Sequence, residues 1–178
     1  MPQSHLLRGL SRLIPALLCA GLASLALAAT EPSDPVREIE RLFHGGDATQ
    51  AFQRLEQVLS TQPDQARLRF LQGVMLSESG RQAEAGTVFE RLTQDYPELP
   101  EPYNNLAVLQ AAEGRLDHAR ELLEAALRND PAYHTARANL GDVFIRLAVR
   151  AYEQASAAAP ADATLQRKLL LARELVAR

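Results

Sequence analysis

The chain has 178 residues, of which 47% are hydrophobic and only 5% aromatic, with no tryptophan. A core of this composition has to come mainly from leucine, alanine and valine, which favours helices over sheets. The formal charge of −3 excludes a nucleic-acid binder that acts through general basicity, and the single cysteine excludes a disulfide within the chain and any multi-cysteine metal site.

The start of the chain, over 1–28, has the pattern of a secretory signal peptide. Arg8 and Arg12 precede an apolar run over residues 13–27, and small residues at Ala26 and Ala28 suit cleavage before Ala29. We therefore expect export to the periplasm or secretion, with residues 1–28 removed. Removing the two arginines from the 19 basic residues leaves 17 against 22 acidic ones, a charge of −5.

Two alternatives to simple cleavage remain open for this segment. One is a retained N-terminal membrane anchor, although the apolar run contains Pro15 and Gly21 and is shorter than the ~20 residues that span a bilayer. The other is lipidation at Cys19, although Leu18 precedes it where lipoprotein sites have a small residue. After cleavage we expect no stable membrane span.

Several residue types recur at one fixed interval after this segment. The recurring residues are Gly46, Gly80 and Gly114; Ala51, Ala85 and Ala119; Leu55, Phe89 and Leu123; and Pro63, Pro97 and Pro131. A glycine just past a helix supplies positive φ, a small alanine lets two helices approach closely, and a proline ends a helix. Each unit therefore predicts a helix, a tight turn and a second helix.

This pattern resembles the tetratricopeptide repeat, a helix–turn–helix unit with the same period. The repeats would span about 32–65, 66–99 and 100–133. The third matches best, through Tyr103, Leu106, Ala107, Gly114, Ala119, Leu123, Ala126 and Pro131. The second departs at Arg69 and Gln72, where large apolar residues are usual. The resemblance implies an all-α, right-handed solenoid over residues 35–178, preceded by a short flexible linker at 29–34.

A fourth repeat, over residues 134–160, is shortened. Gly141 lies one period after Ala107 and so keeps the repeat register. The pattern of the second helix, which ends at Pro160, begins five residues earlier than in the full repeats, and no glycine lies between Gly141 and Pro160. Apolar residues continue at helical spacing through Leu140, Val143, Phe144, Leu147, Ala148, Ala151, Tyr152 and Ala155. We predict one long helix from about Thr135 to Ala158; a hairpin with a shortened turn is the alternative.

A last helix over residues 162–177 is expected to begin at Asp162, whose side chain can cap it. We expect it to act as the capping helix of the solenoid and to cover the last open face. The residues expected to do so are Leu165, Leu169, Leu170, Leu171 and Val176.

No pattern in the sequence indicates catalysis or a bound metal. The four histidines, His5, His44, His118 and His134, have no second histidine three or four residues away. The chain also has no Gly-x-Ser-x-Gly motif, and its carboxylates are spread along predicted solvent-facing sides. We therefore predict a protein that is not an enzyme and that binds no cofactor or metal.

The resemblance implies a concave groove lined by the first helix of each repeat. The groove positions would be Phe70, Val74, Ser77, Glu78, Asn104, Asn105, Val108, Asn139, Asp142 and Arg146. Asn105 and Asn139 are one period apart, so their amides would face the same way and could bond a peptide backbone. The alternative is that these asparagines bond only between neighbouring repeats.

These observations predict an exported adaptor that holds a protein or peptide, and no nucleic acid, in its groove. Some members of the family grip a terminal carboxylate with lysine; this chain has none at the matching places, and Arg67 or Arg137 could substitute. The alternatives are a structural subunit of an envelope assembly (pilus, secretion or outer-membrane machinery) and an accessory to peptidoglycan or envelope enzymes. The sequence leaves the oligomeric state open.

Overall fold

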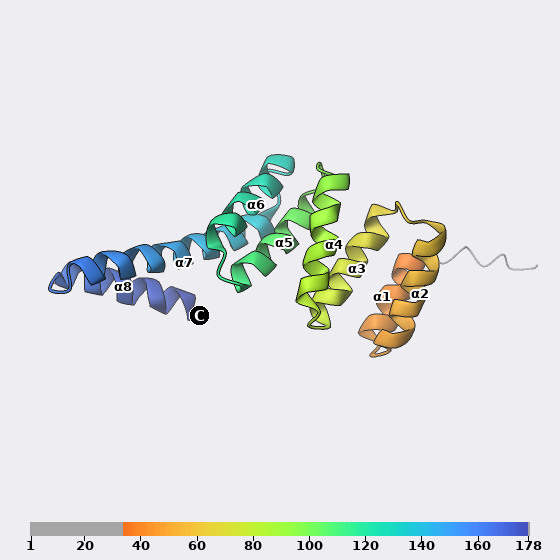
Figure 1. Cartoon of the computed structure of the whole chain (residues 1–178), viewed down its shortest axis with the longest axis horizontal. Helices are drawn as coiled ribbons and strands as arrows, with labels where there is room; N and C mark the ends of the chain where they lie inside the picture. Colours follow the sequence, from red (N-terminus) through yellow and green to blue (C-terminus); the bar gives the residue numbers. More distant parts are fainter. Residues whose placement is uncertain (1–33, 178) are drawn as a thin grey trace, which may run out of the picture. The chain divides into compact units, whose positions relative to one another are not determined.

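The computed structural model describes residues 34–177, which form eight α-helices without strands in that range. The predicted signal segment and nearly all of the predicted linker lie outside these residues. The helices are α1 (Pro35–His44), α2 (Ala48–Thr61), α3 (Ala66–Glu78), α4 (Gln82–Asp95), α5 (Pro100–Ala112), α6 (Leu116–Asn129), α7 (His134–Ala158) and α8 (Ala163–Val176). The first six pair in chain order as three helix hairpins, one for each of the three full repeats (Figure 1).

The turn inside each hairpin depends on a glycine with positive φ. Gly46, Gly80 and Gly114 have φ values of 91°, 78° and 81°, as the period predicts. At the turn after α3, Gly80 N–H donates to the Ser77 carbonyl and Arg81 N–H donates to the Leu76 carbonyl. These bonds satisfy the last carbonyls of the helix, and only glycine reaches this conformation without strain.

The two helices of a repeat approach closely where small residues of one meet large residues of the other. Ala85 of α4 is fully buried, as are its equivalents Ala51 and Ala119. A Cβ atom at Gly73 of α3 would lie 2.5 Å from Cε1 of Phe89, so the phenylalanine ring lies directly on the α3 backbone.

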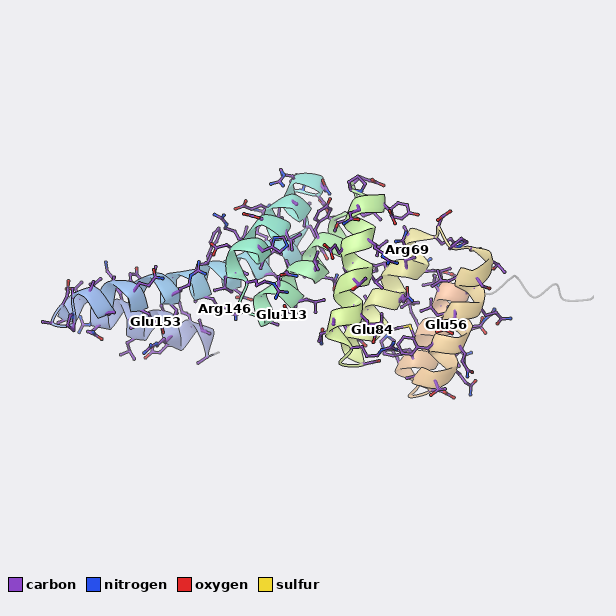
Figure 2. The ribbon with its side chains drawn as sticks, viewed as in Figure 1. Glu56, Arg69, Glu84, Glu113, Arg146 and Glu153 are labelled. Carbon is purple, nitrogen blue, oxygen red and sulfur yellow. The ribbon has the colours of Figure 1, made fainter. Side chains whose placement is uncertain are left out.

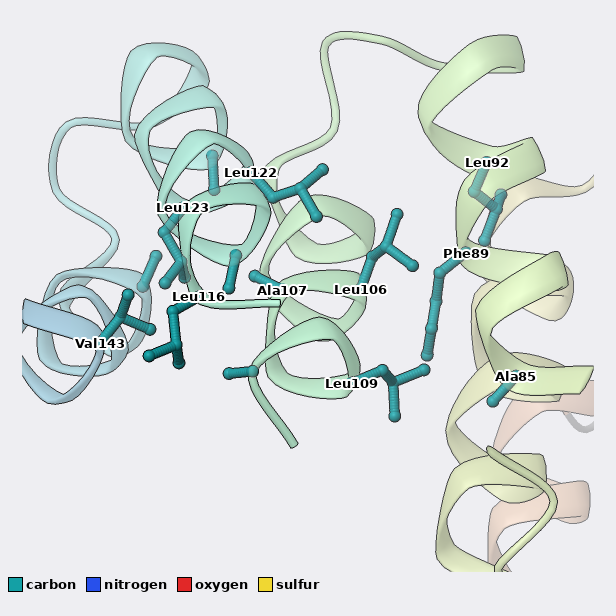
Figure 3. Packing of buried hydrophobic residues seen from close by; sticks show 14 of the residues in the cluster. Ala85, Phe89, Leu92, Leu106, Ala107, Leu109, Leu116, Leu122, Leu123 and Val143 are labelled. Atoms are coloured by element: carbon teal, nitrogen blue, oxygen red, sulfur yellow. The ribbon is translucent and has the colours of Figure 1, made fainter. Parts of the chain in front are cut away.

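The core continues from one repeat into the next. Phe89 belongs to the same buried cluster as Leu106 and Leu109 of α5, and Figure 3 shows its side chain directed toward these two leucines. A second helix is therefore covered on two sides, by its own first helix and by the first helix of the next repeat.

The unusual Arg69 of the second repeat (labelled in Figure 2) is accommodated by polar contacts rather than by the core. Its guanidinium lies 2.6 Å from the Asp95 carboxylate and 5.8 Å from the centre of the Tyr96 ring. A charged residue therefore fills a position where an apolar one is usual, because the end of α4 supplies an acid and an aromatic ring that can partner it.

The fourth repeat is a single continuous helix. α7 runs for 25 residues, so the predicted long helix is confirmed and the shortened hairpin is wrong. Since no glycine follows Gly141 to reverse the chain at the usual turn position, good helix formers such as Leu147 and Ala148 continue the helix. Arg150 also ties α7 to α6: its guanidinium lies 2.7 Å from Asp117, and this hydrogen bond lowers the pKa of the Asp117 carboxyl.

α8 lies alongside the second half of α7 (Figure 1). The Asp162 carboxylate accepts hydrogen bonds from the backbone N–H groups of Thr164 and Leu165, so the predicted cap is confirmed. An ion pair of 2.7 Å between Arg173 and Glu153 (labelled in Figure 2) also joins the two helices.

The prediction that the apolar residues of α8 cover the last open face of the solenoid is wrong. In α8 only Leu169 and Ala172 are buried, whereas Leu170 is 59% exposed and Leu171, Leu175 and Val176 are about half exposed. The reason is that α8 packs against α7 alone, and a single neighbouring helix covers only one stripe of a helix surface. Of the helices formed by residues 34–177, none is both long and apolar enough to cross a bilayer.

We predict that Gly73→Ala destabilises the protein. The added methyl group would meet three atoms of the buried Phe89 ring within 3 Å; overpacking of this kind costs about 1–3 kcal/mol, against a gain of up to ~1 kcal/mol from alanine in a helix. Gly86→Ala in α4 is the control, because its nearest neighbour would lie at 3.8 Å. Urea unfolding should show a lower free energy for Gly73→Ala than for Gly86→Ala; equal values would contradict the close contact.

Candidate binding groove

The first helices α3, α5 and α7 form two hollows on the side that the second helices leave open. The α5/α7 hollow has a volume of about 270 Å³ and the α3/α5 hollow about 290 Å³. The first is lined by Ala107, Val108, Ala111, Ala112, Leu123, Asn139, Asp142, Val143 and Arg146. The second is lined by Ala66, Arg67, Phe70, Leu99, Glu101 and Pro102.

The α5/α7 hollow has an apolar base and a polar rim. Ala107 and Leu123 are buried at its base, and Val108 is 47% exposed although it is β-branched and apolar. Asp142 and Arg146 on α7 supply one carboxylate and one guanidinium at the edge (Figure 2 labels Arg146). The surface can therefore take an apolar side chain and still bond to polar groups beside it.

The α3/α5 hollow is built around an aromatic ring. Phe70 packs against Phe89 with ring centres 5.7 Å apart, so one side of Phe70 is supported and it stays only partly buried. Arg67 and Glu101 add one positive and one negative charge to its lining. The Arg67 guanidinium also lies 3.0 Å from the Asp34 carboxylate, at the start of α1.

The structure brings together some of the predicted groove residues and separates others. Val108, Asn139, Asp142 and Arg146 meet in the α5/α7 hollow, and Phe70 lines the α3/α5 hollow. Neither hollow includes the remaining predicted residues, which are Val74, Ser77, Glu78, Asn104 and Asn105.

Sequence reasoning missed residues that the hollows contain. Glu101 was not predicted, although it lies one repeat period after Arg67, which was predicted only as a possible carboxylate-binding residue. The repeat therefore carried a signal for Glu101 as an equivalent position. Ala111 and Ala112 could not be predicted in this way, because they contribute to the α5/α7 hollow only through the space that their small side chains leave.

The asparagines act mainly between the repeats. Asn104 is only 5% exposed, and its Oδ1 accepts a hydrogen bond of 2.8 Å from Nδ2 of Asn139. Asn104 therefore does not face the open groove as expected, since a buried amide requires a partner inside the protein. Nδ2 of Asn105 donates to the Glu101 carbonyl of its own helix, at 2.9 Å. The alternative of a bond between neighbouring repeats is therefore observed for Asn139, whose partner is Asn104, and not for Asn105.

The second proposed carboxylate-binding arginine is also engaged. Nη2 of Arg137 donates to the Pro131 carbonyl at 2.5 Å. In the described part of the chain, no three His, Cys, Asp or Glu side chains lie close enough together to hold a metal ion.

Comparison with protein families agrees with this architecture. Two family models, each described as tetratricopeptide repeat, match residues 37–100 and 76–140, which together span 37–140. The chain belongs to the tetratricopeptide repeat family.

Solved structures share the fold at low sequence identity. The first tetratricopeptide domain of Spaghetti (RPAP3), bound to the HSP90 peptide SRMEEVD, is 16% identical with a TM-score of 0.58, over 64% of this chain and 90% of that one. A crystal structure of MamA is 20% identical with a TM-score of 0.57, and the match covers 76% of this chain and 82% of that one. A structure of Naa15/Naa10 bound to HypK-THB is 17% identical with a TM-score of 0.55. The match covers 79% of this chain but only 22% of that chain.

We predict that Asn139→Ala destabilises the protein by about 1–3 kcal/mol, because it leaves the buried Asn104 oxygen without its donor. Asn105→Ala is the matched control: its amide bonds only within its own helix, so we expect a change of no more than about 0.5 kcal/mol. The free energy of unfolding of both variants, measured in urea, tests this. A larger loss for Asn105→Ala would show that the bond between repeats has been misassigned.

Proposed function

We propose that this protein is a non-enzymatic adaptor that binds a segment of another protein in the groove of α3, α5 and α7. The observation that carries the proposal is the pair of hollows on successive first helices, each with apolar surface beside charged or polar groups. Their volumes lie at or below the lower end of the range for small-molecule sites. Hollows of this size suit single side chains of a peptide better than a cofactor.

The chemistry of the two hollows describes the segment expected to bind. One apolar side chain would enter the α3/α5 hollow against Phe70, and another would enter the α5/α7 hollow beside Val108. Asp142 and Arg146 would bond polar groups of the segment between or beside these anchors. Buried anchors of this kind provide most of the binding energy in protein interfaces. The Spaghetti domain, whose structure contains a peptide, supports the choice of a peptide as ligand.

We further propose that the protein works in the periplasm or outside the cell, because residues 1–28 combine two arginines, an apolar run and a small-residue cleavage site. Cell fractionation and N-terminal sequencing test this. We expect the protein outside the cytoplasm with Ala29 as its first residue. A chain that stays in the cytoplasm, or that keeps residues 1–28 in the membrane, would contradict export with cleavage.

We predict that Val108→Glu weakens partner binding at least tenfold, or about 1.4 kcal/mol, because it places a charge against the apolar base of the α5/α7 hollow. Ala83→Glu is the matched control, since Ala83 is also exposed but lies on the second helix α4. A photo-reactive amino acid at Asn105 would report binding in cells as a covalent adduct.

The adduct should be lost in Val108→Glu and kept in Ala83→Glu, and a photo-reactive group placed at Ala83 itself should not form it. An adduct that survives Val108→Glu unchanged would show that the partner binds elsewhere.

A further inference from the structure

One side of α7 is left open in the described structure. Its residues follow one another at intervals of three and four along the helix, and so share one side. We call this side the free face of α7; it consists of Gly141, Phe144, Ala148, Ala151 and Ala155. Phe144 is 49% exposed, Gly141 and Ala151 are exposed, and none of the five is fully buried.

The first half of α7 is a first helix that lacks its second helix. Gly141 and Phe144 lie two periods after Gly73 and Leu76 of α3, respectively. In the second repeat the Phe89 ring covers Gly73, and Leu76 is only 4% exposed. At Gly141, by contrast, an added Cβ atom would meet nothing within 4 Å.

The second half of α7 is a second helix that lacks its first helix. Ala148, Tyr152 and Ala155 repeat the spacing of Ala85, Phe89 and Leu92, which are all completely buried in α4. In α7 these three residues are only partly buried.

The continuous helix prevents these two halves from meeting within one chain. In the second repeat, a tight turn at Gly80 brings Phe89 back onto Gly73. In α7 the equivalent Tyr152 follows Gly141 by three turns of one straight helix, or about 16 Å along its axis.

We propose that two copies of this chain pair through antiparallel α7 helices, each supplying the second helix that the fourth repeat of the other lacks. In this arrangement Tyr152 of one copy covers Gly141 of the other, as Phe89 covers Gly73, and the Phe144 side chains become buried. The pairing is reciprocal, so it closes with twofold symmetry and leaves no half unmatched.

Three observations favour a second copy over another partner. The contact continues the interface between first and second helices that the chain already forms in its full repeats. The fourth repeat has lost its turn, and a hinge too short to fold back promotes exchange of equivalent elements between copies. The free face carries no charge, and placing Gly141 against Tyr152 brings Arg137 to the C-terminal end of the other copy's α7, where the helix dipole favours a positive charge.

α8 contacts the second half of α7 beside the free face. This helix buries Leu169 and Ala172, and the Lys168 ammonium lies 6.0 Å from the centre of the Tyr152 ring. On α7 the buried Ser156 is not part of the free face.

Restoring the missing turn tests the proposal. The segment Gly114–His118 fills the turn of the third repeat, and a copy of it inserted between Leu147 and Ala148 restores the full spacing. By light scattering after size exclusion, the purified protein should have twice the mass of one chain, and the insertion variant the mass of one chain. A wild-type protein with the mass of one chain, or an insertion variant that still has the mass of two chains, would overturn the proposal.

Engineered cysteines provide a second test that does not depend on the folding of the insertion variant. In a Cys19→Ser background, Gly141→Cys combined with Ala151→Cys should give a covalent dimer under oxidation, because the pairing places these positions opposite each other. Arg150→Cys with Ala157→Cys is the control, since both residues are exposed on the opposite side of α7. No dimer from the first pair, equal yields from both pairs, or an adduct with a different protein instead, would each show that a second copy does not occupy the free face.

Discussion

The close contact between the two helices of each full repeat organises this solenoid. It requires a small residue on one helix, such as Ala85 or Gly73, so that a large residue such as Phe89 can reach the opposite backbone. It also requires a glycine turn that reverses the chain. Where both are present, a helix hairpin forms and exposes a new face on which the next hairpin packs.

The groove follows from the same constraint. Because α4 and α6 pack on one side of α3 and α5, the other side of these two helices stays open, and the first half of α7 continues that surface. The α5/α7 hollow forms where the small Ala107, Ala111 and Ala112 lie beside Val108, and the α3/α5 hollow forms between Phe70 and the start of α5. The buried Asn104–Asn139 bond then links successive first helices at the side of this surface. The same polar pair that strengthens the stack is thereby removed from the set of free peptide-binding amides.

α7 shows what happens when only part of the constraint is met. It keeps the small residues of a hairpin, Gly141 and Ala148, but has lost the turn between them. The long helix was predictable from sequence, because the absence of a glycine between Gly141 and Pro160 and the apolar spacing are local properties of the chain. The exposure of Phe144 was not, since a stripe of apolar residues does not reveal which neighbour covers it. The same is true of Leu170 in α8, which was expected to be covered and is not.

Local sequence patterns were sufficient to predict the repeat length, the positions of the turns, the long α7 and the cap of α8 at Asp162. Each of these depends on backbone preferences and capping groups within a few residues, or on spacing along one helix. Other features arise from tertiary packing: the burial of Asn104 against Asn139, the position of Arg67 and Glu101 beside Phe70, and the exposure of Leu170, Leu171 and Leu175 on α8. These outcomes depend on the distance between helices that are far apart in the sequence, which the periodicity of a single helix does not contain.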